Sequence, residues 1–217
     1  MLAASVFFFF ERGSVDAKWK MSLLVSGLIT VIAAVHYFYM RDYYLATGDN
    51  PTFFRYVDWT LTVPLMCVEF YLLTKAAGAT RSLLWKLILA STWMLVCGYI
   101  GEAFSDGTTG HSVTWGVLST IGYLYIAYTV WFGEVAQLAE KSNSDAIKKG
   151  VKYLAWFVLV GWSIYPIGYM CMEGGWLSSF MAPESVDVWY NIADAINKIG
   201  FGLVVYSIAI AESNKKV

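Results

Sequence analysis

Long apolar segments separated by short polar ones dominate the chain. A helix needs about 20 apolar residues to cross the hydrocarbon core of a bilayer, and six segments reach that length. The connections between them are short and polar, such as TGDNPT and SDGTTGH. The pattern therefore predicts six full membrane-spanning helices, over residues 21–45, 53–75, 82–103, 113–138, 151–172 and 188–211.

A shorter apolar segment, LAASVFFFF, precedes these six and ends at the polar sequence ERGSVDAKWK. At 1.5 Å per residue it makes about 15 Å of helix, which is half of the ~30 Å hydrocarbon core. No small-residue cleavage site follows it, as a signal peptide would require. We interpret it as the second half of a first span. The expected fold is an all-α, seven-helix membrane bundle that forms one domain over residues 1–217.

The composition agrees with a membrane protein and excludes several function classes. Hydrophobic residues make up 58% of the chain and charged residues 14%, with a mean hydropathy of +0.55, whereas a soluble domain has about 25% charged residues. The net charge of −1 gives no reason to expect a nucleic-acid partner. The two histidines, His36 and His111, are too few for a zinc site, and no catalytic Cys-His or Ser-His-Asp pattern indicates an enzyme. The three cysteines lie in apolar segments and form no metal-binding motif: Cys67, Cys97 and Cys171.

Lysine and arginine are distributed asymmetrically. If the spans alternate in direction, twelve of the fifteen basic residues lie on one side, only Arg41 lies near the other, and Arg55 and Lys198 lie inside spans. Loops rich in lysine and arginine face the cytoplasm. Seven crossings then predict an extracellular N-terminus and a cytoplasmic C-terminus. The twelve are Arg12, Lys18, Lys20, Lys75, Arg81, Lys86, Lys141, Lys148, Lys149, Lys152, Lys215 and Lys216.

A polar stripe follows one face of the span over residues 53–75. Asp58 and Glu69 are eleven residues apart, about three helical turns or 16 Å, and Thr62 and Arg55 lie on the same face. In one interpretation Arg55 and Asp58 form an ion pair and Glu69 reaches the cytoplasmic interface. In the other, the two acids are stations for a proton. Apolar neighbours favour the protonated form of Glu69.

The last span carries Asp194 and, one turn later, Lys198 near its middle. An ionised side chain at the bilayer centre costs roughly 2.5–3.5 kcal/mol even on the most lenient scale. The lysine is either a member of a structural ion pair or a reactive amine. A desolvated lysine readily forms a Schiff base with a carbonyl compound. The protonated adduct would need counter-ions, which Asp194 and Asp58 can supply.

Aromatic residues share one face of the span over residues 151–172. Trp162, Tyr165 and Tyr169 are spaced i, i+3 and i+7, with Pro166 beside them, and Trp59 follows Asp58 in the earlier span. Aromatic residues at this spacing are typical of helix packing. Beside a reactive lysine they also suit a slot for a flat, apolar, conjugated ligand.

The sequences RYVDWTLTVPLMCVEFYL, GWSIYPIGYM and YNIADAINKIGFGL resemble the third, sixth and seventh helices of microbial rhodopsins. The resemblance covers essentially the whole chain and is strongest to proteorhodopsins, the light-driven proton pumps of marine bacteria. It implies all-trans retinal on Lys198, Asp58 as counter-ion and proton acceptor, and Asp194 as second counter-ion. It also implies Glu69 as proton donor and His36 as the histidine that pairs with the acceptor.

The resemblance also assigns a subtype. Asp58, Thr62 and Glu69 match the Asp-Thr-Glu pattern of outward proton pumps, and Met66 stands where an apolar residue accompanies green absorption. A sensory photoreceptor of the same fold, and a retinal-free transporter or receptor, remain as alternatives. The further residues expected at the proton path and around retinal are Arg55, Trp59, Thr62, Met66, Trp162, Tyr165, Pro166, Tyr169 and Tyr190.

Finally, the resemblance implies a location in the bacterial inner membrane, with the lipid bilayer and protons as partners, and a homo-oligomer of five or six copies. A carotenoid antenna is a further option that no residue here supports. Gly122 either leaves a gap beside a retinal ring or is a glycine of ordinary helix packing; the second interpretation is favoured.

Overall fold

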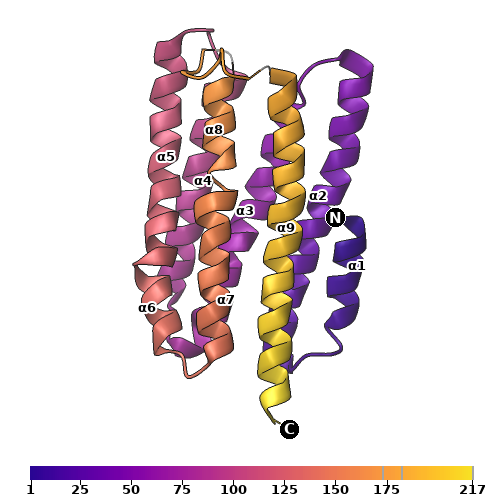
Figure 1. Cartoon of the computed structure of the whole chain (residues 1–217), viewed down its shortest axis with the longest axis vertical. Coiled ribbons are helices and arrows are strands. Elements are labelled where there is room, and N and C mark those ends of the chain that lie inside the picture. Colours follow the sequence, from indigo (N-terminus) through magenta and orange to yellow (C-terminus); the bar gives the residue numbers. More distant parts are fainter. Residues whose placement is uncertain (173, 182, 217) are drawn as a thin grey trace.

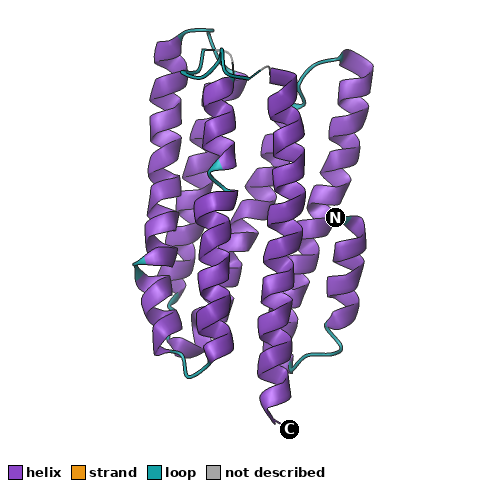
Figure 2. Cartoon of the chain, viewed as in Figure 1, coloured by secondary structure: helices purple, strands orange, loops and turns teal. Residues whose placement is uncertain are grey.

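The chain forms a bundle of helices that run along one common axis (Figure 1). The computed structural model describes residues 1–172, 174–181 and 183–216, and these ranges contain helices, turns and loops without any strand (Figure 2). Within them, six helical segments are long and apolar enough to span a membrane. This confirms the all-α class. The helices are α1 (Leu2–Glu11), α2 (Lys20–Thr47), α3 (Thr52–Thr74), α4 (Arg81–Ala103), α5 (Thr109–Trp131), α6 (Glu134–Lys141), α7 (Asp145–Trp156), α8 (Ile164–Cys171) and α9 (Pro183–Ser213).

The short helix α1 packs beside one half of α2, and its first residue lies at mid-height of the bundle (Figure 1). A Cβ atom added to Gly27 of α2 would lie 2.4 Å from the ring of Phe9, so the two helices are in close contact there. Phe8 is fully buried, and the hydroxyl of Tyr206 in α9 donates to Glu11 Oε2 over 3.0 Å. The apolar segment at the start of the chain is therefore part of the bundle, as expected.

The span predicted over residues 113–138 is not one continuous helix. It begins earlier, where the Thr108 side chain accepts a hydrogen bond from the backbone N–H of His111 over 3.3 Å, and α5 ends at Trp131. The backbone N–H groups of Phe132 and Gly133 both bond the carbonyl of Tyr128. Gly133 then starts α6 in an extended conformation. Apolar periodicity does not report this break, because Val135, Leu138 and Ala139 of the more polar helix α6 continue the helical spacing of apolar residues from α5.

The span predicted over residues 151–172 is also interrupted. Its helix α7 begins at Asp145, capped by the Ser144 side chain, which accepts from the Ile147 N–H over 3.2 Å. The wider π-helical segment Phe157–Gly161 follows, and two turn residues separate it from α8. Figure 2 shows this break as a short loop between α7 and α8. Pro166 explains it, because proline has no N–H and crowds the preceding turn.

The remaining spans agree with the prediction in position, with α9 starting five residues earlier than expected. Helix α3 continues through Pro64. Helices α4 and α5 approach closely at Gly122, where an added Cβ would lie 2.6 Å from the Ala90 carbonyl oxygen. The interpretation of Gly122 as a packing glycine is therefore confirmed. The connections α1–α2 and α6–α7 and the C-terminus all lie at one end of the bundle (Figure 1).

Candidate functional site

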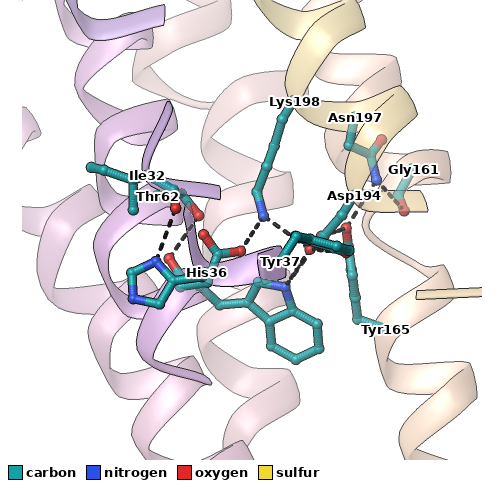
Figure 3. A network of polar contacts seen from close by, with 11 residues as sticks. Ile32, His36, Tyr37, Thr62, Gly161, Tyr165, Asp194, Asn197 and Lys198 are labelled. Atoms are coloured by element: carbon teal, nitrogen blue, oxygen red, sulfur yellow. Dashed lines mark hydrogen bonds and ion pairs between the residues drawn. The ribbon is translucent and has the colours of Figure 1, made fainter. Parts of the chain in front are cut away.

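Lys198 of α9 and Asp58 of α3 meet inside the bundle. Lys198 Nζ lies 2.5 Å from Asp58 Oδ2 and 2.9 Å from Asp194 Oδ2, which is one turn away on the same helix. The side chains of all three residues are at most 2% exposed. Two carboxylates thus enclose one ammonium group away from water, in the arrangement that the sequence predicts (Figure 3).

In addition to its ion pair with Lys198, Asp194 accepts hydrogen bonds from side chains of three other helices. The hydroxyl of Tyr165 in α8 donates to Oδ1 over 2.6 Å, the indole N–H of Trp59 in α3 donates over 3.1 Å, and the hydroxyl of Tyr37 in α2 donates to Oδ2 over 2.9 Å. Sequence reasoning missed Tyr37. Its position directly after His36 in an apolar span carries no signal, because tyrosine is also common in lipid-facing positions.

Asp58 has fewer protein donors than Asp194. Lys198 bonds its Oδ2 atom, and Oδ1 has no hydrogen-bond partner among the described residues. The hydroxyl of Thr62 donates to the backbone carbonyl of Asp58 over 2.9 Å and not to the carboxylate. The ring of His36, which is half-buried, has its Nδ1 atom 2.9 Å from the Ile32 carbonyl oxygen (Figure 3). No hydrogen bond joins the described side chains of His36 and Asp58.

Arg55 has a different partner from the one that the ion-pair interpretation gives it. Its Nη2 atom lies 2.8 Å from Asp187 Oδ1 of α9, and its Nη1 atom donates to Asn50 Oδ1 over 2.9 Å. The guanidinium also lies over the ring of Tyr190, 5.1 Å from its centroid. The proposed pair of Arg55 with Asp58 is therefore wrong. Asp187 lies seven residues, or two turns, before Asp194, and that spacing is the signal that could have identified it.

Glu69 is fully buried and faces α2. Its Oε1 atom accepts a hydrogen bond from the Ser26 hydroxyl over 3.1 Å, and Oε2 has no hydrogen-bond partner among the described residues. The interpretation in which Glu69 reaches the cytoplasmic interface is wrong, because its side chain stays inside the bundle. Ser26 was not predicted, since small hydroxyl residues are also ordinary packing residues between membrane helices.

A cavity of about 340 Å³ lies beside Lys198. Most of the retinal-binding residues predicted from the aromatic pattern and from the resemblance lie on α3, α8 and α9 and line this cavity. Thr62 is the predicted residue that does not line it. Helices α4 and α5 complete the wall with residues that the sequence analysis did not single out, including Met94, Gly98, Gly116 and Thr120. The predicted residues in the lining are Trp59, Met66, Trp162, Tyr165, Pro166, Tyr169, Tyr190 and Lys198.

Comparison with known proteins decides the family. The family model for bacteriorhodopsin-like proteins matches residues 1–212. The chain is 42% identical to a green-light absorbing proteorhodopsin of Gamma-proteobacterium EBAC31A08 over 99% of this chain and 84% of that protein. It is 44% identical to a blue-light absorbing proteorhodopsin of Gamma-proteobacterium Hot 75m4, over 99% of this chain and 83% of that protein. The chain belongs to the microbial rhodopsins.

The fold agrees with this assignment. The crystal structure of a blue light-absorbing proteorhodopsin from Med12 superposes with a TM-score of 0.81 at 40% identity, covering 97% of this chain and 93% of that one. Microbial rhodopsins of this type are light-driven, retinal-dependent proton pumps of bacterial membranes and not classical enzymes. The helical bundle, with six long apolar helical segments among the residues that the structure describes, is that of a multi-pass membrane protein.

The residues of this microbial rhodopsin fit a retinal group. The cavity volume is within the range of about 300–1,000 Å³ typical of small-molecule sites, and aromatic and apolar side chains form most of its wall. Lys198 is the one lysine in the described lining, so its amine is the available group for a Schiff base. Asp58 and Asp194 already lie where a cation on that nitrogen would need them.

Proposed function

We propose that this microbial rhodopsin is a light-driven outward proton pump that carries all-trans retinal on Lys198. The observation that carries the proposal is the placement of two buried carboxyl groups on α3: Asp58 beside Lys198 and Glu69 about three turns further along the helix. When bound, retinal supplies light absorption and a change in geometry at the lysine nitrogen. The proton steps belong to the side chains of the protein.

Asp58 is the proposed acceptor and main counter-ion. Its carboxylate lies within hydrogen-bonding distance of the Lys198 nitrogen, so a proton can pass between them without rearrangement of the backbone. Asp194 is the proposed second counter-ion. Its three additional donors, described above, hold its negative charge in place and favour Asp58 over Asp194 as the group that takes up the proton.

Glu69 is the proposed donor that returns a proton to the lysine nitrogen. It is closed off from water and bonded to the hydroxyl of Ser26, and it lies nearer than Asp58 to the end of the bundle that carries the C-terminus. Most lysine and arginine residues belong to that end, and we assign it to the cytoplasm on this basis. A donor on the inner side and an acceptor on the outer side make the net transport outward.

Met66 lines the cavity next to Lys198 and offers no dipole to stabilise the ground-state charge, so we propose green absorption. A homo-oligomer of five or six copies in the bacterial inner membrane stays a prediction that rests on the family. The arrangement of Arg55, Asp187 and Asn50 places a hydrogen-bonded ion pair between Asp58 and the outer end of the bundle.

The proposal is tested by illuminating cells that express the protein with added retinal in unbuffered medium. Outward pumping acidifies the medium in the light, and a protonophore abolishes the change. Asp58→Asn should remove the signal, whereas Asp106→Asn, an exposed loop carboxyl, should retain it and serves as the matched control. Alkalinisation of the medium, or no light-dependent change in a coloured protein, would contradict the proposal; the second result favours a sensory photoreceptor.

A further inference from the structure

The break between α7 and α8 leaves a backbone carbonyl without its regular helical donors. In an α-helix the carbonyl of Gly161 would accept from the N–H of Tyr165, but this N–H bonds the carbonyl of Trp162 over 3.2 Å. In the π-helical register that ends at Gly161, the donor would be residue 166, which is proline and has no N–H. A donor from outside the helix is therefore needed.

Asn197 of α9 supplies that donor. Its Nδ2 atom donates to the Gly161 carbonyl over 3.0 Å and lies 3.3 Å from the Tyr165 hydroxyl oxygen (Figure 3). The residue is 3% exposed. A Cβ atom on Gly161 would lie 2.0 Å from Asn197 Oδ1, so the glycine is what permits the amide to approach. We call the contact of Asn197 with Gly161 and Tyr165 the asparagine clamp.

The clamp continues into the site around Lys198. The hydroxyl of Tyr165 accepts from Asn197 and donates to Asp194 Oδ1 over 2.6 Å, and Asp194 Oδ2 is paired with Lys198. Hydrogen bonds in such a chain polarise and strengthen one another in a low-dielectric interior. Asn197 is also the direct chain neighbour of Lys198, so one turn of α9 carries both the clamp and the reactive amine.

We propose that Asn197 is a positioning residue that couples the break in α7–α8 to the charge balance at Lys198. When the clamp is intact, the Tyr165 hydroxyl is held as a donor to Asp194, and the broken helix is held against α9. Loss of the clamp loosens the backbone around Pro166 and weakens the hydrogen bond to Asp194 at the same time. This inference rests on the proposed function and deepens it. It names Asn197 as a residue that adjusts the charge balance between the counter-ions Asp58 and Asp194.

The first variant, Asn197→Leu, removes the donor and keeps the branching at Cγ and the number of side-chain heavy atoms. The second, Gly161→Ala, leaves Asn197 intact and displaces it by steric contact. The matched control is Gly150→Ala on α7, where the added methyl group also meets a buried side chain, Ile208, with its Cδ1 and Cγ1 atoms at 2.2 and 2.4 Å, but does not touch the clamp. It carries the same gain in helix propensity, so the difference between the two alanine variants reports the clamp.

Two measurements on the purified protein with retinal in the dark test the proposal. Hydrogen–deuterium exchange of the peptide over residues 162–167 reports the backbone at the break. A pH titration of the visible spectrum reports the protonation of Asp58. Its neighbours are the charged Lys198 and Asp194 from α9 and the titratable ring of His36 from α2. A typical hydrogen bond contributes a factor of about two to ten, so Asn197→Leu should speed local exchange about two- to tenfold.

The same factor corresponds to a change of about 0.3 to 1 pH unit in the midpoint of the colour titration. We expect that change in both Asn197→Leu and Gly161→Ala, measured against Gly150→Ala. Faster exchange with a midpoint within about 0.1 unit of the control would show a merely structural contact and overturn the coupling. Unchanged exchange in Asn197→Leu would overturn the clamp itself. A parent protein that binds no retinal or does not pump contradicts the proposed function instead, and the exchange measurement remains readable in that case.

Discussion

Replacing Lys198 tests both the retinal linkage and the electrostatics of the buried site. Lys198→Met removes the amine and retains an unbranched side chain of similar length. No other lysine lines the described cavity, so the variant should be colourless after reconstitution with retinal. Visible colour in the variant, together with retinal that stays covalently bound to the denatured protein after borohydride reduction, would show that retinal is attached elsewhere.

The same substitution should destabilise the protein by an amount that the geometry indicates. Lys198 lies 2.5 Å from Asp58 and 2.9 Å from Asp194, and neither carboxylate is more than 1% exposed. Removing one partner of a buried ion pair leaves an uncompensated charge and costs about 3–5 kcal/mol. This is a large part of the 5–15 kcal/mol that typically separates folded from unfolded states. The comparison must use the parent protein without retinal, because a bound ligand stabilises the folded state.

A second substitution should reverse most of this loss. In the double variant Lys198→Met with Asp58→Asn, a neutral amide replaces the acceptor carboxylate. Asp194 keeps its hydrogen bonds from Tyr37, Trp59 and Tyr165. Each hydrogen bond to a charged group contributes about 1.5–3 kcal/mol, which is enough to hold one buried carboxylate. Thermal unfolding followed by circular dichroism in matched detergent gives the comparison. Equal stability of the single and the double variant would refute the electrostatic reasoning.

Three further outcomes follow from the proposed roles. Acidification should protonate Asp58 and move the absorption to longer wavelength, and replacing His36 should move the midpoint of this titration. A spectrum that is constant through the acid range would show that Asp58 is not the counter-ion. In flash photolysis, Glu69→Gln should slow the return of the proton to the lysine nitrogen, and azide should restore part of the rate. The control Glu140→Gln, which changes an exposed carboxyl, should behave as the parent. Equal rates of proton return in both variants would show that Glu69 is not the donor. Met66→Gln should shift the absorption to the blue, and a parent that already absorbs blue light at alkaline pH would contradict the green assignment.

The sequence predicted the helical bundle well because the bilayer imposes a simple rule on it. A span must be apolar over about 20 residues and must satisfy its backbone internally, and both requirements are visible in one sequence. The two internal breaks were not predicted. Gly133 and Pro166 are the residues responsible, but each is also tolerated within continuous membrane helices, as Pro64 is in α3. Only the surrounding packing decides between a kink, a break and no effect.

The charged part of the site was equally accessible from sequence, whereas its hydrogen-bond donors were not. An acid or a lysine inside a membrane span is costly, so its presence alone indicates a function or a partner. Asp58, Glu69, Asp194 and Lys198 stand out for that reason, and the structure brings three of them into direct contact. Partner choice is a different problem. The spacing of Asp187 from Asp194 marks it as a candidate, but the pairing of Arg55 with Asp187 and not with Asp58 depends on how α3 and α9 cross.

Neutral donors carry little cost in a membrane helix, so the sequence gives them no distinguishing mark. Tyr37, Ser26 and Asn197 sit among other hydroxyl and amide residues that face lipid or pack between helices, and each becomes significant only through the acceptor opposite it. Their acceptors differ: the Asp194 carboxylate for Tyr37, the Glu69 carboxyl for Ser26, and a backbone carbonyl for Asn197. Buried charges can therefore be read from composition and position, but the groups that tune them require the three-dimensional arrangement. For this reason, variants at such neutral donors are the sharpest test of whether the arrangement around Lys198 is the one described.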